Sequence, residues 1–134
     1  MDPNTLIIKR SKLIYPELSY KISGLAFKVH NELGPGYMEK HYQRAIKAML
    51  IRENIGFKEQ FSVNLPGKGQ IGHYYIDFLI DNKIILEIKT VPRFTRDNIF
   101  QVIRYLKETN LELGILASFA RRELIYRRIL KGYK

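Results

Sequence analysis

The sequence predicts a single α/β domain in which helices cover the faces of a mixed β-sheet. Apolar residues recur at helical spacing near the N-terminus, alternate with polar residues through the middle, and return to helical spacing between two later strand-like segments. A three-stranded meander followed by a helical crossover combines antiparallel and parallel pairing in one sheet. The 134 residues, 46% of them hydrophobic, suffice for one domain with a core. We expect residues 1–17 to form an N-terminal arm and residues 18–134 the domain.

Positive charge dominates the composition. Twenty-three Lys and Arg residues oppose thirteen Asp and Glu residues, which gives a formal net charge of +10. A field of this sign attracts polyanions, of which nucleic acid is the commonest. An acidic protein partner or an anionic surface is the alternative.

The chain has no cysteine, which excludes disulfides, thiolate nucleophiles and cysteine-based zinc sites. The N-terminal residues lack a secretory hydrophobic region, and no apolar run approaches the roughly 20 residues that a membrane span needs. We therefore expect a cytoplasmic protein that does not enter a membrane.

Two helices are expected first. Residues 17–33 carry a stripe of apolar side chains: Leu18, Ile22, Leu25, Ala26 and Val29. The turn Gly34-Pro35-Gly36 ends this helix. Residues 37–53 carry a second stripe: Tyr42, Ala45, Ile46, Met49 and Leu50.

Three strands follow. The first alternates through Phe61, Val63 and Leu65 and ends in a turn at residues 66–69. The second covers residues 71–80 and the third residues 83–90, with a tight turn at Asp81-Asn82 between them. Residues 95–108 return to helical spacing, residues 111–117 fit a buried strand, and residues 121–130 fit a closing amphipathic helix.

The second and third strands carry an unusual set of charged residues. Asp77 lies within the second strand, and Glu87 and Lys89 share one face of the third. With a two-residue turn, Asp77 would lie opposite Leu86, and the two acids would be on different faces of the sheet. A three-residue turn or a bulge would bring Asp77 beside Glu87.

Two carboxylates in otherwise apolar strands suggest a cation site. A buried carboxylate is costly unless it is paired or binds a metal, and Mg²⁺ prefers one or two carboxylates together with water and phosphate oxygens. Lys89 would then project into the same pocket and stabilise a developing negative charge. The alternative is an exposed sheet face with a Glu87–Lys89 ion pair.

Three further residues flank this group. Gln101 and Tyr105 are four apart and lie together on the following helix, where they would bind a phosphate or orient Lys89. The alternative for this pair is a polar helix flank with one core tyrosine. Glu39 is a third candidate metal carboxylate, or else an acidic residue favoured by the N-terminal helix dipole.

These residues resemble a known family. Residues 36–42 read G-x-x-E-x-x-Y, and they are followed by Gln60, Asp77, the E-x-K of Glu87 and Lys89, and the Q-x-x-x-Y that ends at Tyr105. The pattern is similar to the small prokaryotic GxxExxY proteins, a branch of the PD-(D/E)XK nuclease superfamily. Ile76 stands where the superfamily has its namesake proline, which many members lack.

The resemblance implies a restriction-endonuclease-like core, αβββαβ, here with an extra N-terminal helix and a C-terminal helix. It implies that Mg²⁺ or Mn²⁺ binds to Glu39, Asp77 and Glu87. It also implies that Lys89 activates water or phosphate, and that Gln101 and Tyr105 assist. The function expected is therefore divalent-metal-dependent hydrolysis of phosphodiester bonds in DNA.

Other residues are expected to bind nucleic acid. Arg93 and Arg96 lie just after the third strand, and Lys68 lies in the turn between the first and second strands. A homodimer is plausible, because small nucleases of this fold often pair. Two alternatives remain: a non-catalytic module that binds nucleic acid or protein, and a subunit that is active only with a partner.

Overall fold

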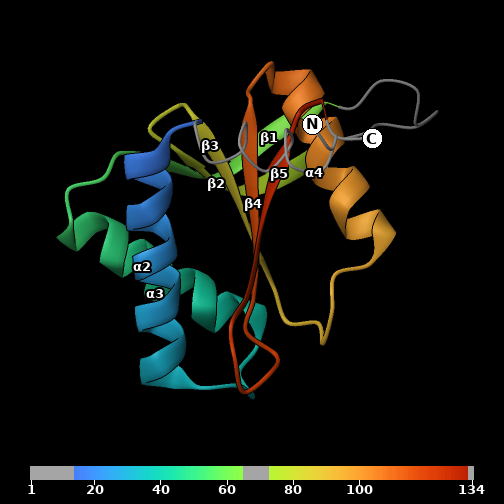
Figure 1. Ribbon diagram of the computed structural model, residues 1–134. Helices are drawn as coiled ribbons and strands as arrows, with labels where there is room; N and C mark the ends of the chain where they lie inside the picture. Colours follow the sequence, from blue (N-terminus) through green and yellow to red (C-terminus); the bar gives the residue numbers. More distant parts are fainter. Residues whose placement is uncertain (1–13, 65–72, 133–134) are drawn as a thin grey trace, which may run out of the picture.

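The computed structural model describes residues 14–64 and 73–132. The elements in this part of the chain are α2 (Pro16–Leu33), α3 (Glu39–Arg52), β1 (Phe57–Asn64), β2 (His73–Ile80), β3 (Ile84–Lys89), α4 (Arg96–Thr109), β4 (Leu113–Ser118) and β5 (Ile125–Leu130) (Figure 1). The predicted N-terminal arm, residues 1–17, lies largely outside the described residues. In the described part, no helix is both long and apolar enough to span a membrane.

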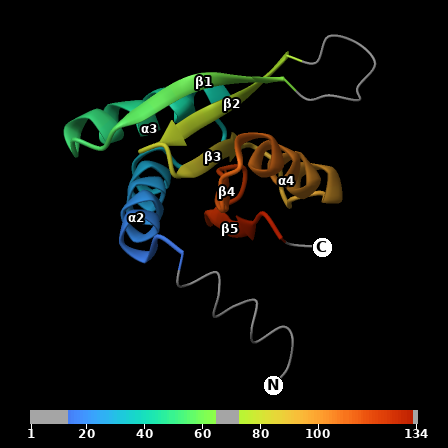
Figure 2. The same ribbon diagram turned by 90° about the horizontal axis from the view of Figure 1, so that it is seen from above.

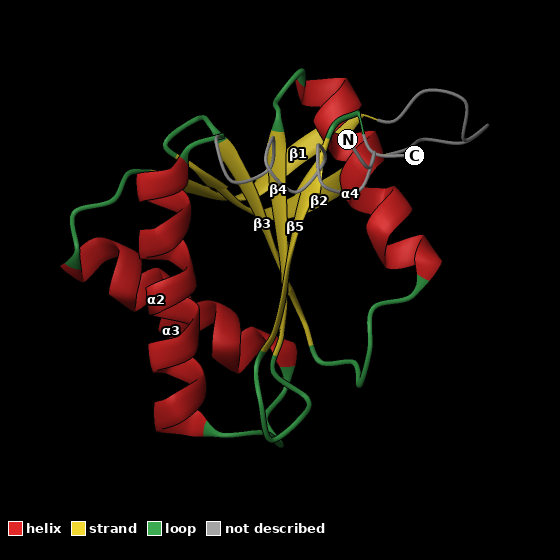
Figure 3. Ribbon diagram, in the orientation of Figure 1, coloured by secondary structure: helices red, strands yellow, loops and turns green. Residues whose placement is uncertain are grey.

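The strands form one mixed sheet in the order β1-β2-β3-β4-β5. The pair β3–β4 is parallel and the other neighbouring pairs are antiparallel. Helix α4 makes the crossover from β3 to β4 and packs on one face, while α2 and α3 cover the other (Figures 2 and 3). The prediction of a mixed sheet between helices is confirmed.

The two N-terminal helices bury the apolar stripes that the sequence predicts. The buried residues of these stripes are Ile22, Leu25, Ala26, Val29, Tyr42, Ile46, Met49 and Leu50. Gly34 ends α2 with a φ of 69°, in the left-handed region that suits glycine. The chain can therefore turn sharply and begin α3 five residues later, at Glu39.

Helix α4 is capped at its start and packs unusually close to β4. The Thr95 hydroxyl accepts a hydrogen bond from the Asn98 amide at 3.1 Å, and the Asn98 side chain accepts one from the Thr95 amide at 3.0 Å. On the buried side, a Cβ on Gly114 of β4 would lie 2.4 Å from Cγ1 of Val102. The glycine thus sets the spacing between the helix and the sheet.

The C-terminal segment is a strand, which corrects the prediction of a closing helix over residues 121–130. Residues Ile125–Leu130 form β5 and pair antiparallel with β4 along its whole length. Leu130 and Tyr126 face the α2 layer, while Ile129 faces α4. Residues two apart therefore share a face, and the pairing satisfies backbone groups of β4 that a helix would have left open.

Candidate active site

A three-residue turn sets the register between β2 and β3. Asp81 and Asn82 both have a φ of 53°, and the Lys83 amide donates to the Ile80 carbonyl at 2.9 Å. The resulting pairs, Ile80 with Ile84 and Phe78 with Leu86, confirm the longer of the two turns considered from the sequence.

Next to Phe78–Leu86 the regular pairing of β2 and β3 stops. Asp77 would come next in register with Glu87, but the Asp77 carboxylate Oδ2 instead accepts a hydrogen bond from the Ile88 amide at 2.8 Å. The two acids thus lie side by side where the strands separate.

At this level, the alternation of side chains between the two faces of the sheet reverses in both β1 and β2. Ile76 packs with the α4 core, whereas Phe78 packs with the α2–α3 core, so side chains two apart face opposite sides. Regular alternation along a strand would instead place both on one face. In β1 the change occurs at Gln60, which has a φ of 49° and would pair with Asp77, between the observed pairs Glu59–Phe78 and Phe61–Ile76. Because the alternation reverses in both strands at the same pair, the register of β1 against β2 is the same before and after Gln60.

Glu87 is buried against this break. Its side chain is on the α4 face of β3, and only 3% of the residue is exposed. Burial raises the pKa of the Glu87 carboxyl well above its usual range, and the negative charge and hydrogen-bonding carboxylate of Asp77 raise it further. Lys89 acts in the opposite direction. One nearby ammonium group does not neutralise two carboxylates. A divalent cation would supply the missing positive charge.

Glu39 reaches the same place from the first residue of α3. Partial burial raises the pKa of the Glu39 carboxyl, the positive charge of Lys89 lowers it, and the negative charge of Asp77 raises it. Hydrogen bonds from the backbone and side chain of Thr90 also lower it. These interactions put Glu39 within electrostatic range of both Asp77 and Lys89.

The acids do not form a closed metal cage. Within residues 14–64 and 73–132, no group of three or more His, Cys, Asp and Glu side chains has a geometry that could hold an ion. The donor chemistry nevertheless fits Mg²⁺ or Mn²⁺, which are held by one or two carboxylates with water and phosphate completing the coordination. Asp77 interacts electrostatically with both Glu87 and Glu39, and Lys89 interacts with the same two glutamates.

Helix α4 brings the two accessory residues to the site. Lys89 Nζ donates to Gln101 Oε1 at 3.4 Å. Tyr105, one turn further on, is 2% exposed. Its pKa is raised by burial and then by the negative charges of Glu87 and Asp77, so its hydroxyl keeps its proton. The structure thus brings Gln101 and Tyr105 together with the acids and the lysine.

The expected nucleic-acid contacts are only partly described. Arg93 is exposed in the loop after β3, and Arg96 is exposed at the start of α4. Both follow closely on Lys89, at the end of β3 where the acids gather. Lys68 lies outside the described residues.

A scaffold behind the site was missed by sequence reasoning. The Tyr42 hydroxyl donates to the Gly34 carbonyl at 2.6 Å and accepts from the Tyr37 amide at 3.2 Å. Its ring stacks on Phe119 at 4.5 Å between centroids, and the Phe119 amide donates to the Lys89 carbonyl at 3.0 Å. Tyr42 therefore links the start of α3 to the end of β3. The G-x-x-E-x-x-Y motif marks Tyr42, but nothing in the sequence marks Phe119.

Comparison with known proteins gives the class. The family model described as the PD-(D/E)XK nuclease superfamily matches residues 16–129. The chain therefore belongs to the PD-(D/E)XK nuclease superfamily, which confirms the predicted superfamily and fold class.

One solved structure shares this fold, and a second one is similar over part of its length. The structure of LHK-Exo in complex with dAMP is 16% identical, with a TM-score of 0.51 over 69% of this chain and 54% of that one. The alkaline exonuclease LHK-Exo from Laribacter hongkongensis also matches, at 12% identity and a TM-score of 0.49, over 79% of this chain and 76% of that one. The first match shows a shared fold, and this chain spans about half the length of that protein. A search of curated proteins gives no significant match.

Proposed function

We propose that the protein is a divalent-metal-dependent nuclease that hydrolyses phosphodiester bonds in DNA, and that it belongs to the GxxExxY branch of its superfamily. The observation that carries the proposal is the acidic pair of half-buried Asp77 and buried Glu87, beside a lysine that Gln101 contacts. A module that only binds has no use for such a pair, because its burial is costly.

Each residue has a role in this proposal. Asp77 and Glu87, with Glu39 beside them, would hold Mg²⁺ or Mn²⁺. The bound cation would offset charge on the phosphate and make water more acidic. Lys89, oriented by Gln101, supplies an ammonium to the oxygens on which charge develops. Tyr105 keeps a neutral hydroxyl donor beside Glu87.

Substrate binding completes the proposal. The exposed guanidinium groups of Arg93 and Arg96 would contact phosphates next to the scissile bond, and Lys68 would contact them from the β1–β2 connection. A homodimer would present two such sites to a duplex. A cytoplasmic location is the expectation from composition.

The decisive experiment is cleavage of labelled DNA and RNA, single- and double-stranded, with Mn²⁺ and with EDTA. The wild type is expected to cleave DNA with Mn²⁺ and to be inactive in EDTA, and Lys89→Ala is expected to lose at least about a hundredfold in rate. Lys83→Ala is the matched control, because Lys83 lies in the β2–β3 turn and pairs with Asp81 at the surface. Equal activity of wild type and Lys89→Ala would refute the proposed site.

A second candidate is a module that keeps the fold and binds nucleic acid without cleaving it. The open arrangement of the three acids favours this candidate. Tight DNA binding with no cleavage by the wild type under any divalent metal would establish it. A subunit that needs a partner would instead gain activity when that partner is added.

A further inference from the structure

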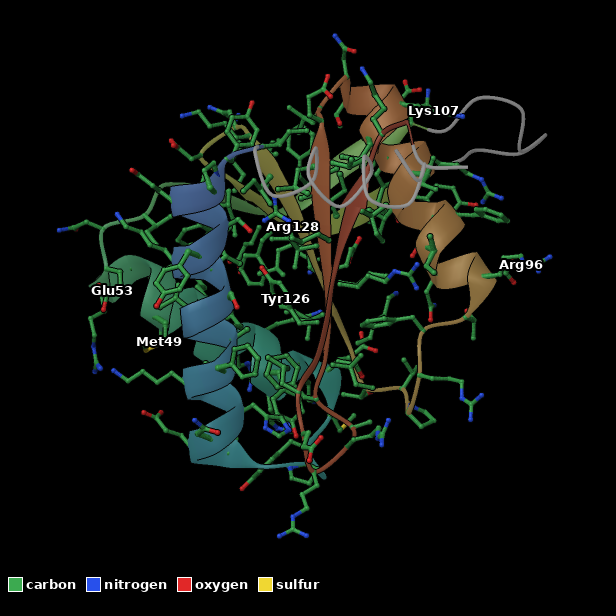
Figure 4. All side chains as sticks on the ribbon, viewed as in Figure 1. Met49, Glu53, Arg96, Lys107, Tyr126 and Arg128 are labelled. Carbon is green, nitrogen blue, oxygen red and sulfur yellow. The ribbon has the colours of Figure 1, made fainter. Side chains whose placement is uncertain are left out.

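The outer side of α4 carries a line of cations interrupted by one aromatic ring. Arg96, Phe100 and Arg104 follow one another at intervals of four residues, and Lys107 comes three residues later, so all four lie on one side of the helix. We call these four residues the α4 stripe. All are exposed, and Arg96 and Lys107 point outward from opposite ends of α4, away from the sheet (Figure 4).

The cations of the α4 stripe have no acidic partner among the residues that the structure describes. In the described part of the chain, no ion pair joins Arg96, Arg104 or Lys107 to an acidic side chain. Asp97 and Glu108 flank the stripe, on the side of the helix toward Gln101, and neither forms such a pair. Surface cations that lack intramolecular partners are available to an external anion.

Phe100 distinguishes the stripe from an ordinary solvated helix face. Its side chain is large and apolar, yet the residue is 40% exposed between two arginines. An exposed ring beside guanidinium groups is suited to stacking an unpaired base while the cations bind the adjoining phosphates. A duplex keeps its bases stacked on each other and offers no such partner.

The stripe lies on the helix that also borders the candidate active site. Arg96 is the first residue of α4, and the inner side of the same helix supplies Gln101 to Lys89. From Arg96 to Lys107 the helix rises about 16 Å, which is long enough to follow several phosphates. A strand bound along the stripe would therefore lie on the same helix that contacts Lys89.

We propose that the α4 stripe binds a single-stranded segment of the nucleic acid substrate, with one unpaired base stacked on Phe100. The inference rests on the proposed nuclease function and adds to it the substrate class, a strand with an unpaired region next to the cleaved bond. The stripe itself needs no metal.

The test measures binding of a fluorescein-labelled single-stranded oligonucleotide by fluorescence anisotropy in EDTA, across a series of salt concentrations. Arg104→Ala/Lys107→Ala is expected to weaken binding about tenfold and to reduce the slope of log K against log salt by about 1.4, or ~0.7 for each lost phosphate contact. Lys21→Ala/Lys28→Ala removes the same charge from the exposed side of α2 and is expected to leave the slope unchanged. Equal effects of the two double variants would overturn the proposal.

The stacking part has its own readout. Phe100→Ala is expected to weaken binding of the single strand about tenfold and to leave a blunt duplex unaffected, while Phe100→Tyr keeps the affinity. Melting temperatures confirm that each variant is folded. Unchanged binding by folded Phe100→Ala would overturn this part. Binding is measured without metal, so the two proposals can fail separately. Failure to cleave DNA in Mn²⁺ would refute the nuclease function. Loss of binding confined to the stripe variants would still support strand binding by the α4 stripe.

Discussion

The Asp77 carboxylate accepts a hydrogen bond from the Ile88 amide at 2.8 Å, where β2 and β3 separate. A side chain here replaces the backbone partner that regular pairing would have provided. The bond fixes the Asp77 carboxylate beside Glu87, so the fold itself holds two negative charges together. This arrangement is the basis of the first two predictions.

Replacing Asp77 with asparagine separates the structural role from the metal-binding role. Asp77→Asn keeps an oxygen that can accept the Ile88 N–H but removes the charge. Wild type is expected to gain about 10 °C in melting temperature when Mn²⁺ is about 100 times its Kd, and the variant is expected to lose most of that gain. Differential scanning fluorimetry with and without Mn²⁺ measures both. An equal gain in the two proteins would show that the ion binds elsewhere.

Glu87 is expected to destabilise the metal-free protein at neutral pH. Since its pKa in the folded state is raised above the usual 4.5, the free energy of unfolding falls as pH rises from about 4.5 through the folded pKa. Glu87→Gln resembles the protonated form and is expected to unfold with about 1–3 kcal/mol more free energy at pH 7 in EDTA. Urea denaturation from pH 4 to 8 measures the difference.

The matched control for Glu87→Gln is Glu59→Gln. Glu59 is exposed and pairs with Lys47 at the surface, so its loss should change stability by at most about 1 kcal/mol. A wild type that is as stable as Glu87→Gln at every pH would contradict the proposed repulsion.

Gln60 adopts a backbone conformation that glycine tolerates better. A φ of 49° within a strand costs an L-residue roughly 1–2 kcal/mol, whereas glycine in an ordinary strand position costs about 0.5–1 kcal/mol. Gln60→Gly is therefore expected to stabilise the protein by about 0.5–1 kcal/mol in urea denaturation. Asn64→Gly, an exposed position of β1 without positive φ, should destabilise it. Loss of stability in Gln60→Gly would mean that the glutamine side chain holds the reversal of β1 in place.

The contact between Gly114 and Val102 predicts a compensating pair. Gly114→Ala would place a methyl 2.4 Å from a stiff, buried valine and is expected to cost about 1–3 kcal/mol. Val102→Ala leaves a cavity and is expected to cost a similar amount, but the double variant should cost less than the sum. A double-mutant cycle in urea measures the coupling. Strict additivity would show that α4 shifts away from β4 instead.

Periodicity predicts the helices well and the strands only in part. The spacing of apolar residues predicts α2 and α3 to within two residues at each end, because each buries one stripe. In the segment Ile125–Leu130 the apolar residues follow helical spacing, and pairing with the open edge of β4 overrides that pattern. That edge exists only once the sheet has formed.

The candidate site is likewise only partly predictable from the sequence. Asp77, Glu87 and Lys89 can be predicted as a group from their places in two neighbouring strands, whereas their register depends on the length of one turn. The reversal of side-chain alternation at Gln60 and Asp77 gives no signal in the hydrophobic pattern. Both faces of the sheet are covered by apolar cores, so an apolar residue fits either face. Long-range partners such as Phe119 depend on packing, for which spacing along the chain gives no signal.

The scaffold behind the site joins the helices α2 and α3 to the segment from Phe119 to β5. His30 contacts the Arg121 carbonyl at 2.8 Å, Arg128 donates to the Ser19 hydroxyl, and the ring of Tyr42 rests on Phe119. A nascent chain halted before Phe119 would give Tyr42 nothing to stack on and would lack Arg128 altogether. The start of α3, where Glu39 lies, thus gains this support only after Phe119 has been synthesised, and a ribosome-bound intermediate halted earlier would carry the acids without the scaffold behind them.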